Sequence, residues 1–253
     1  MTHDEALFQF LLRMGDNTLI LGHRVSEWCG HSPVLEEDIA LANTALDLIG
    51  QTQFWLGLAG EVEGQGRTAD DLAFHRDAWD FRNLLLVELP NGDFGQTLMR
   101  QFLFDAYQSV LLGRLISSSD ERVAAIAAKA SKEVAYHVER SADTVVGLGD
   151  GTEESHARMQ AALDYLWPYV GEMFTGDEVD AAMADTGIAP DSASLQEDFN
   201  VLISRVMGEA TLSVPNAKYS HKGGRSGVMH TEHLGHLLTS MQWLQRAYPG
   251  AAW

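Results

Sequence analysis

Residues 35–62 have the sequence LEEDIALANTALDLIGQTQFWLGLAGEV, and this stretch decides the fold. Apolar residues recur along it at steps of three and four, which is the spacing of an α-helix and not of a β-strand. The segment is apolar on nearly every side, so at least part of its surface must be buried against other helices. The glycine-rich segment Glu63–Gly66 then ends the helix.

The same periodicity continues on both sides of this segment. It predicts three more long helices, at about 6–28, 93–117 and 120–146. Shorter helices are expected at 68–87, 153–174, 177–183, 192–212 and 231–248. Pro168 should kink or interrupt the helix over 153–174, because proline lacks the amide donor. We therefore expect an all-α fold: a bundle of the four long helices in a single domain over residues 1–253, with the C-terminal helices of 153–248 packed around it.

Composition excludes several classes of function. The 253 residues include 17 Lys and Arg against 36 Asp and Glu, a formal net charge of −19. This charge opposes binding to nucleic acid and to anionic membrane surfaces. A single cysteine excludes a disulfide framework and any Cys-rich metal site. With no basic N-terminal leader and no apolar run long enough to span a bilayer, the chain is expected to be cytoplasmic.

Polar side chains share faces on the four long helices, where a bundle core is expected. Four helices that each direct carboxylates or carboxamides inward have the geometry of di-iron carboxylate bundles. The residues are Asp16, His23 and Glu27 on the first helix, Asn43, Asp47 and Gln51 on the second, Gln101, Asp105 and Gln108 on the next, and Lys129, Glu133, Tyr136, His137 and Arg140 on the last.

The spacing of metal ligands argues against iron in this bundle. Di-iron bundles require Glu-x-x-His on two helices, but Tyr136 stands three residues after Glu133 and His137 stands four after it. The single Glu-x-x-His of the chain, Glu153 to His156, lies at an expected exposed helix start, where the helix dipole explains the acid.

Two interpretations of the polar interior stay open. Asp47, Asp105, Glu133 and His137 are the candidate metal ligands, although Glu133 and His137 equally fit a hydrogen bond on one helix face. We favour a retired site, in which cations replace metal ions and compensate the buried carboxylates. Arg24, Lys129 and Arg140 are the candidate cations. The run His230, His233 and His236 turns progressively around a helix, which favours an interface or a capped helix start over a zinc site.

Six short segments, in this order, carry a family resemblance. They are LRMGDN (12–17), SEWCGH (26–31), DIALAN (38–43), NLLLVE (83–88), KEVAYH (132–137) and HTEHLG (230–235). Together they resemble the C subunits of bacterial phenylacetyl-CoA epoxidase, also called ring 1,2-phenylacetyl-CoA epoxidase. The resemblance runs from Leu12 to Trp253.

This resemblance implies a ferritin-like fold and a place in a multicomponent monooxygenase for aerobic phenylacetate degradation. Such complexes convert phenylacetyl-CoA to a ring epoxide with dioxygen and NADPH. The related A subunit holds the di-iron centre, a small subunit bridges the assemblies, and a reductase with FAD and an iron–sulfur cluster delivers electrons. The C subunit is the non-catalytic structural partner. The resemblance therefore implies no catalytic residue, metal or cofactor in this chain.

Two other functions remain as alternatives: an active di-iron or di-manganese oxidase or oxygenase with atypical ligands, and a stand-alone ferritin-like scaffold. A homodimer also stays open for the chain alone. Lys222 and Arg225 are cations set among glycines in an acidic chain. They are candidates to contact a phosphate of coenzyme A or an acidic patch on a partner, against the simpler alternative of a solvated loop.

Overall fold

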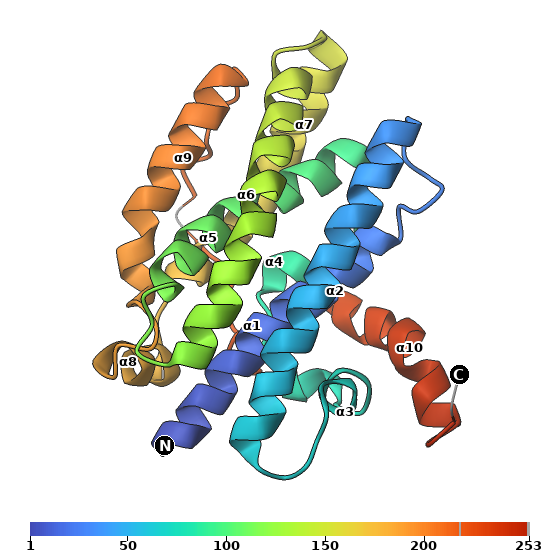
Figure 1. Ribbon diagram of the computed structural model, residues 1–253. Helices are drawn as coiled ribbons and strands as arrows, with labels where there is room; N and C mark the ends of the chain where they lie inside the picture. The colour runs from blue at the N-terminus through green and yellow to red at the C-terminus, as the bar shows by residue number, and fades with distance from the viewer. Residues whose placement is uncertain (218, 252–253) are drawn as a thin grey trace. The chain divides into compact units, whose positions relative to one another are not determined.

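A computed structural model describes residues 1–217 and 219–251, and Figure 1 shows helices joined by loops. No strand occurs among these residues, so the predicted all-α class is confirmed. None of the helices within them is both long and apolar enough to cross a membrane. Trp253, where the family resemblance ends, lies outside the described residues.

The helices gather into two compact units. The first, Met1–Pro90 with Lys222–Trp253, contains α1 (His3–Ser26), α2 (Leu35–Glu63), α3 (Ala69–Phe74), the 3₁₀ turn η1 (Ala78–Asp80), α4 (Leu85–Glu88) and α10 (Glu232–Ala247). The second, Asn91–His221, contains α5 (Phe94–Leu115), α6 (Glu121–Gly149), α7 (Glu153–Leu166), η2 (Trp167–Phe174), α8 (Glu178–Asp185), η3 (Ser192–Leu195) and α9 (Gln196–Glu209). A single domain over residues 1–253 stays a prediction.

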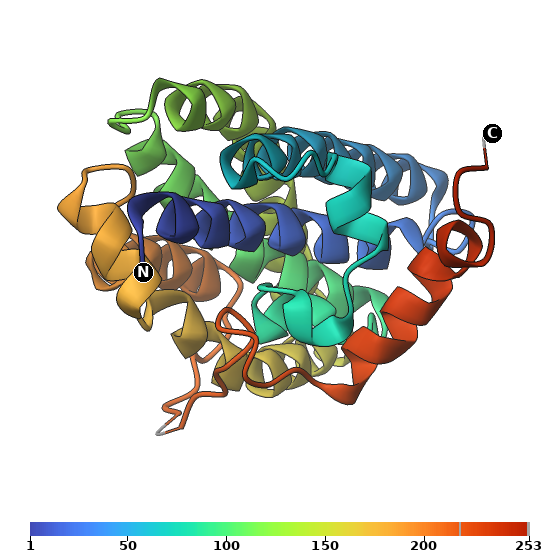
Figure 2. The ribbon, with the colours of Figure 1, turned by 90° about the horizontal axis from the view of Figure 1, so that it is seen from below.

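The first unit is built on α1 and α2, which lie side by side in Figures 1 and 2. A capping box at Thr2 starts α1, and Gly64, with a φ of 70°, ends α2 in the left-handed conformation that suits glycine. Between the two helices, the hydroxyls of Thr18 and Thr52 lie 2.8 Å apart within an otherwise apolar contact.

The second unit has the corresponding long pair, α5 and α6, which pack against each other. Their starts are fixed by aspartate caps: Asp93 accepts the amide of Gln96 at 2.8 Å, and Asp120 accepts that of Arg122 at 2.9 Å. The four long helices that a ferritin-like fold requires are thus present, close to their predicted bounds.

The break at Pro168 is confirmed. The α-helix α7 ends at Leu166, and the chain continues as the 3₁₀ segment η2, which has Pro168 in its first turn. The predicted helices at 177–183, 192–212 and 231–248 correspond to α8, to η3 with α9, and to α10.

The prediction of one helix over 68–87 is wrong. This segment forms α3, η1 and α4, joined by irregular backbone. The amide of Arg82 donates to the carboxylate of Asp16 at 2.8 Å, and the amide of Leu84 donates to the side chain of Asn17 at 2.7 Å. Because both amides find their acceptors on α1, the backbone satisfies them without continuing the helix.

Two glycines of α2 give a matched test of packing. A Cβ at Gly60 would overlap the backbone carbonyl oxygen of Arg67, whereas a Cβ at Gly57 meets nothing within 4 Å. We expect Gly60→Ala to lower the free energy of unfolding by about 1–3 kcal/mol, because backbone must shift. Gly57→Ala should raise it by about 0.5–1 kcal/mol. Urea denaturation of both variants measures this, and equal effects would contradict the close approach at Gly60.

Candidate functional site: a charge-compensated polar interior

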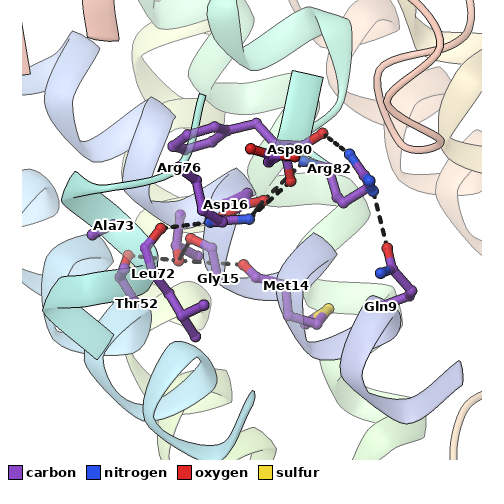
Figure 3. Close-up of polar contacts among 12 residues, drawn as sticks. Gln9, Met14, Gly15, Asp16, Thr52, Leu72, Ala73, Arg76, Asp80 and Arg82 are labelled. Atoms are coloured by element: carbon purple, nitrogen blue, oxygen red, sulfur yellow. Dashed lines mark hydrogen bonds and ion pairs between the residues drawn. The ribbon is translucent and has the colours of Figure 1, made fainter. Parts of the chain in front are cut away.

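The carboxylate of Asp16 on α1 is fully shielded from solvent in the first unit. Arg76 binds both of its oxygens, through Nη2 to Oδ1 and through Nη1 to Oδ2 at 3.0 Å. The backbone amide of Arg82 adds a donor to Oδ2 at 2.8 Å. Figure 3 shows these groups converging on Asp16 from the segment after α3. Both carboxylate oxygens are therefore engaged by the protein itself.

Arg76 is held in this position from several sides. Its Nε donates to the carbonyl of Leu72 at 2.5 Å, and its Nη1 also donates to the carbonyl of Asp80 at 3.0 Å. Its guanidinium lies over the ring of Phe81, 4.4 Å from the ring centroid. Because this buried cation faces a buried anion, the pair avoids the large cost of an isolated interior charge.

Arg82 extends the same cluster toward the start of α1. Its Nε donates to the side-chain oxygen of Gln9 at 2.9 Å (Figure 3). Burial lowers the pKa of Arg82, while the attraction of Asp16 acts in the opposite direction. Arg82 thus joins both sides of the cluster, with its backbone amide on Asp16 and its guanidinium on Gln9.

A second buried carboxylate, Glu88 at the end of α4, anchors the start of α10. Its Oε2 accepts from Asn83 Nδ2 at 3.0 Å and lies 2.9 Å from His230 Nδ1, while Oε1 accepts from the amide of Thr231. The other ring nitrogen of His230 lies 3.2 Å from the carbonyl of Phe81. Both ring nitrogens of His230 therefore lie against oxygen atoms, which holds the ring between Glu88 and the carbonyl of Phe81.

Asp105 on α5 is a buried carboxylate of the second unit. Gln101 Nε2 donates to Oδ1 at 2.7 Å, and the hydroxyl of Ser141 on α6 donates to Oδ2 at 3.0 Å. Burial raises the pKa of Asp105 to about 6, against the opposing effects of His137, these hydrogen bonds and Arg140. The group therefore titrates close to neutral pH.

The structure brings two of the four candidate metal ligands into electrostatic contact, namely Asp105 and His137. Glu133 lies one turn before His137 on α6 and is half-buried, and Asp47 is half-buried on α2 in the first unit. Within residues 1–217 and 219–251, no three His, Cys, Asp or Glu side chains gather as ligands of a metal ion would. The donors on Asp105 do not fit a di-iron centre, and the absence of a metal in this chain stays a prediction.

Not every predicted polar stripe points inward. Glu27, Asn43 and Tyr136 are exposed, whereas Asp16, Gln51 and the α5 residues Gln101 and Gln108 are buried. The expectation that all members of each stripe enter one core is therefore wrong in part. Helical spacing predicts which residues lie on one face of a helix. It does not predict how much of that face the neighbouring helices cover.

The cations predicted to compensate the interior are only part of the observed set. Arg140 acts on Asp105, and Arg24 pairs with Glu27 at 3.1 Å while its Nη2 donates to the carbonyl of Glu88 at 2.9 Å. The buried cation that pairs with Asp16 is Arg76, which is not among the predicted residues. Arg76 lies in the segment 68–87, for which a continuous helix is predicted. A continuous helix gives no indication that this side chain turns toward Asp16.

The Glu-x-x-His pattern of the second unit, Glu153 to His156, has a structural explanation. Glu153 is exposed in the first turn of α7, as predicted. His156 Nδ1 lies 2.8 Å from the carbonyl of Gly149, and so it secures the turn between α6 and α7.

Lys222 and Arg225 lie in one segment of the first unit but in different environments. Lys222 is exposed, whereas Arg225 is buried and its carbonyl accepts from Arg13 Nε at 3.1 Å. A Cβ at the intervening Gly224 would overlap the carbonyl of Asn83, so the glycine permits close packing on the chain itself. A ligand contact at Lys222 and Arg225 stays a prediction.

Comparison with known proteins gives two findings. The family model described as phenylacetic acid catabolic protein matches residues 1–253. The chain is also 47% identical over 247 residues to the C subunit of 1,2-phenylacetyl-CoA epoxidase from Escherichia coli (strain K12), an alignment that covers 98% of this chain and 99% of the relative.

The pair of Asp16 and Arg76 predicts a large effect of a single substitution. Arg76→Met should lower the free energy of unfolding by about 3–5 kcal/mol, because it leaves a buried carboxylate without its cation. The matched control is Arg114→Met in the exposed pair with Asp198, where the two side chains are 56% and 52% exposed. That variant should change stability by less than about 1 kcal/mol. Denaturant unfolding compares the two, and a similarly small effect of Arg76→Met would contradict the assigned role.

Asp105 predicts a specific pH dependence of stability. Its pKa of about 6 in the folded chain exceeds the ordinary value of 3.8, so folding takes up a proton between these pH values. The contribution of this group to stability is present below about pH 4 and is lost as pH rises through 6, amounting to about 2–3 kcal/mol. Asp105→Asn removes the titration. The stability of the natural chain minus that of Asp105→Asn should fall across this range, and a constant difference would contradict the raised pKa.

Proposed function

The chain belongs to the family of phenylacetic acid catabolic proteins, and from this premise we propose that it is the non-catalytic structural subunit of a phenylacetyl-CoA 1,2-epoxidase complex. In this role it stabilises a related di-iron catalytic subunit during aerobic phenylacetate degradation. The relative at 47% identity is named as the C subunit of such an epoxidase, and the alignment spans nearly all of both chains.

The observation that carries the non-catalytic assignment is the state of the buried carboxylates. Both oxygens of Asp16, of Glu88 and of Asp105 lie within hydrogen-bond distance of side-chain or backbone groups of the chain. Iron would have to displace those groups, including the guanidinium of Arg76, before it gained a carboxylate ligand. This supports an interior whose carboxylates serve the fold.

The proposal assigns the cofactors to other subunits. Di-iron belongs to the catalytic A subunit, and FAD, an iron–sulfur cluster and NADPH belong to the reductase, with a small subunit bridging the assemblies. The complex acts in the cytoplasm. The candidate partners of this chain are therefore proteins, and its own part in the reaction is to hold a catalytic neighbour in place.

Lys222 is the residue that we keep as a candidate contact to coenzyme A or to an acidic surface of a partner. It is exposed, whereas Arg225 is buried and contributes to packing. Gly224 next to it permits close packing against Asn83.

The test is to produce the chain with and without the other subunits of its own epoxidase. We expect the chain to co-purify with the catalytic subunit, and the iron to remain with that subunit after the two are separated, leaving well under one iron per structural chain. Elemental analysis and the stoichiometry of the complex measure this.

Two outcomes would contradict the proposal. About two irons retained by the isolated chain, and lost on substitution of Asp105 or His137, would identify an active di-metal protein. A stable chain that binds no other subunit would identify a stand-alone scaffold. The control for iron loading is Glu153→Gln, at an exposed acid outside the interior.

A further inference from the structure

Helix α2 carries two separate apolar stripes, and each follows the alternating four-and-three spacing of a helix–helix contact. The first stripe is fully buried and faces α1, against which α2 packs along its length. Its members are Leu41, Ala45, Leu48, Thr52, Trp55 and Ala59. Thr52 of this stripe lies 2.8 Å from Thr18 of α1, and Leu48 lies beside Gly22, so the stripe takes part in the contact within the first unit.

The second stripe has the same spacing but remains largely uncovered. Leu35 and Leu46 are each 70% exposed, and Ile39 is 53% exposed. At 3.6 residues per turn, this face points about a third of a turn away from the buried one. The docking face of α2 is defined here as Leu35, Ile39, Ala42, Leu46, Ile49 and Gln53.

A hollow of about 260 Å³ adjoins this face near the middle of α2. Ile49 and Gln53 of the docking face form one wall, and residues of α1, α3 and α10 form the others. Leu19, Ala73, Phe74 and Met241 make the lining mostly apolar. An exposed stripe beside an apolar hollow suits a partner that presents one large apolar side chain within a longer row.

The charges along α2 favour one kind of occupant. The helix has no lysine or arginine, and it has six acidic residues: Glu36, Glu37, Asp38, Asp47, Glu61 and Glu63. Two copies of this face packed together would bring like charges into contact, which destabilises such a pair. A partner with basic residues beside its apolar row is attracted instead.

We propose that the docking face of α2 binds an α-helix of the catalytic subunit of the epoxidase complex. That helix carries large apolar residues at four-and-three spacing and lysine or arginine along its margins. The inference deepens the proposed function, on which it rests, because it names the surface through which the structural subunit holds its partner. A long, continuous apolar row on one helix accommodates a second helix, since two helices interlock through such rows.

The experiment uses the full chain and the other subunits of its own epoxidase, produced together. We expect Leu46→Glu to weaken binding of the catalytic subunit by about 100-fold or more, because a charge enters an apolar contact. Val201→Glu on α9 is the matched control, since Val201 is 68% exposed against 70% for Leu46. It should stay within about threefold of the natural chain, as scattered surface positions do. Thermal melts of the isolated variants establish that both remain folded.

A second variant tests the charge argument separately. Glu36 and Glu61 are exposed and lie on the same margin of the docking face. Glu36→Lys/Glu61→Lys should weaken binding of the catalytic subunit several-fold at low salt, and added salt should weaken the natural complex more than the variant complex.

Several results would overturn the proposal. If Leu46→Glu binds the catalytic subunit as tightly as the natural chain does, the docking face is not the binding surface. The proposed function would not be affected by that result. A homodimer of the isolated chain that Leu46→Glu dissociates would assign the face to a second copy. A natural chain that binds no other subunit would contradict the proposed function itself, and with it the occupant named here.

Discussion

A carboxylate cannot stay ionised within an apolar core unless donors and a cation surround it, and Asp16 imposes this constraint on the first unit. The segment between α3 and α4 supplies both the guanidinium of Arg76 and the amide of Arg82. A continuous helix would tie that amide to a carbonyl four residues earlier. The irregular backbone is therefore the conformation that lets two different groups reach one carboxylate. Glu88 likewise accepts a hydrogen bond from a backbone amide, that of Thr231 at the start of α10.

The sequence predicted well those features that depend on nearby residues. The bounds of α2 were within one residue of the prediction, because a glycine ends the helix locally. The helix over 68–87 failed because its amides bond to Asp16 and Asn17, more than sixty residues away. Local periodicity contains no information about such acceptors. The same failure hid Arg76, whereas the burial of Asp105 and His137 followed correctly from the faces that they share with apolar residues.

The two apolar stripes of α2 also explain why this helix is apolar on nearly every side. A helix that is apolar on nearly every side is expected to be buried all round, yet Leu35, Ile39 and Leu46 are exposed while the stripe beginning at Leu41 is buried. Sequence alone does not distinguish a face that is buried within the chain from one that is covered by another protein, because both require the same residues. Exposure in the folded chain separates them, and it leaves Leu35, Ile39 and Leu46 without an intramolecular role.

The buried ion pair of Asp16 and Arg76 raises the question of why the interior holds charges at all. A buried ion pair gives no more stability than well-packed apolar residues would, so the Asp16–Arg76 pair does not persist because it strengthens the fold. It is explained if the bundle geometry already placed carboxylates inward and the chain acquired its own cations in place of metal. The oxygens of Asp16, Glu88 and Asp105 are held by groups of the chain itself, which is what such a replacement requires.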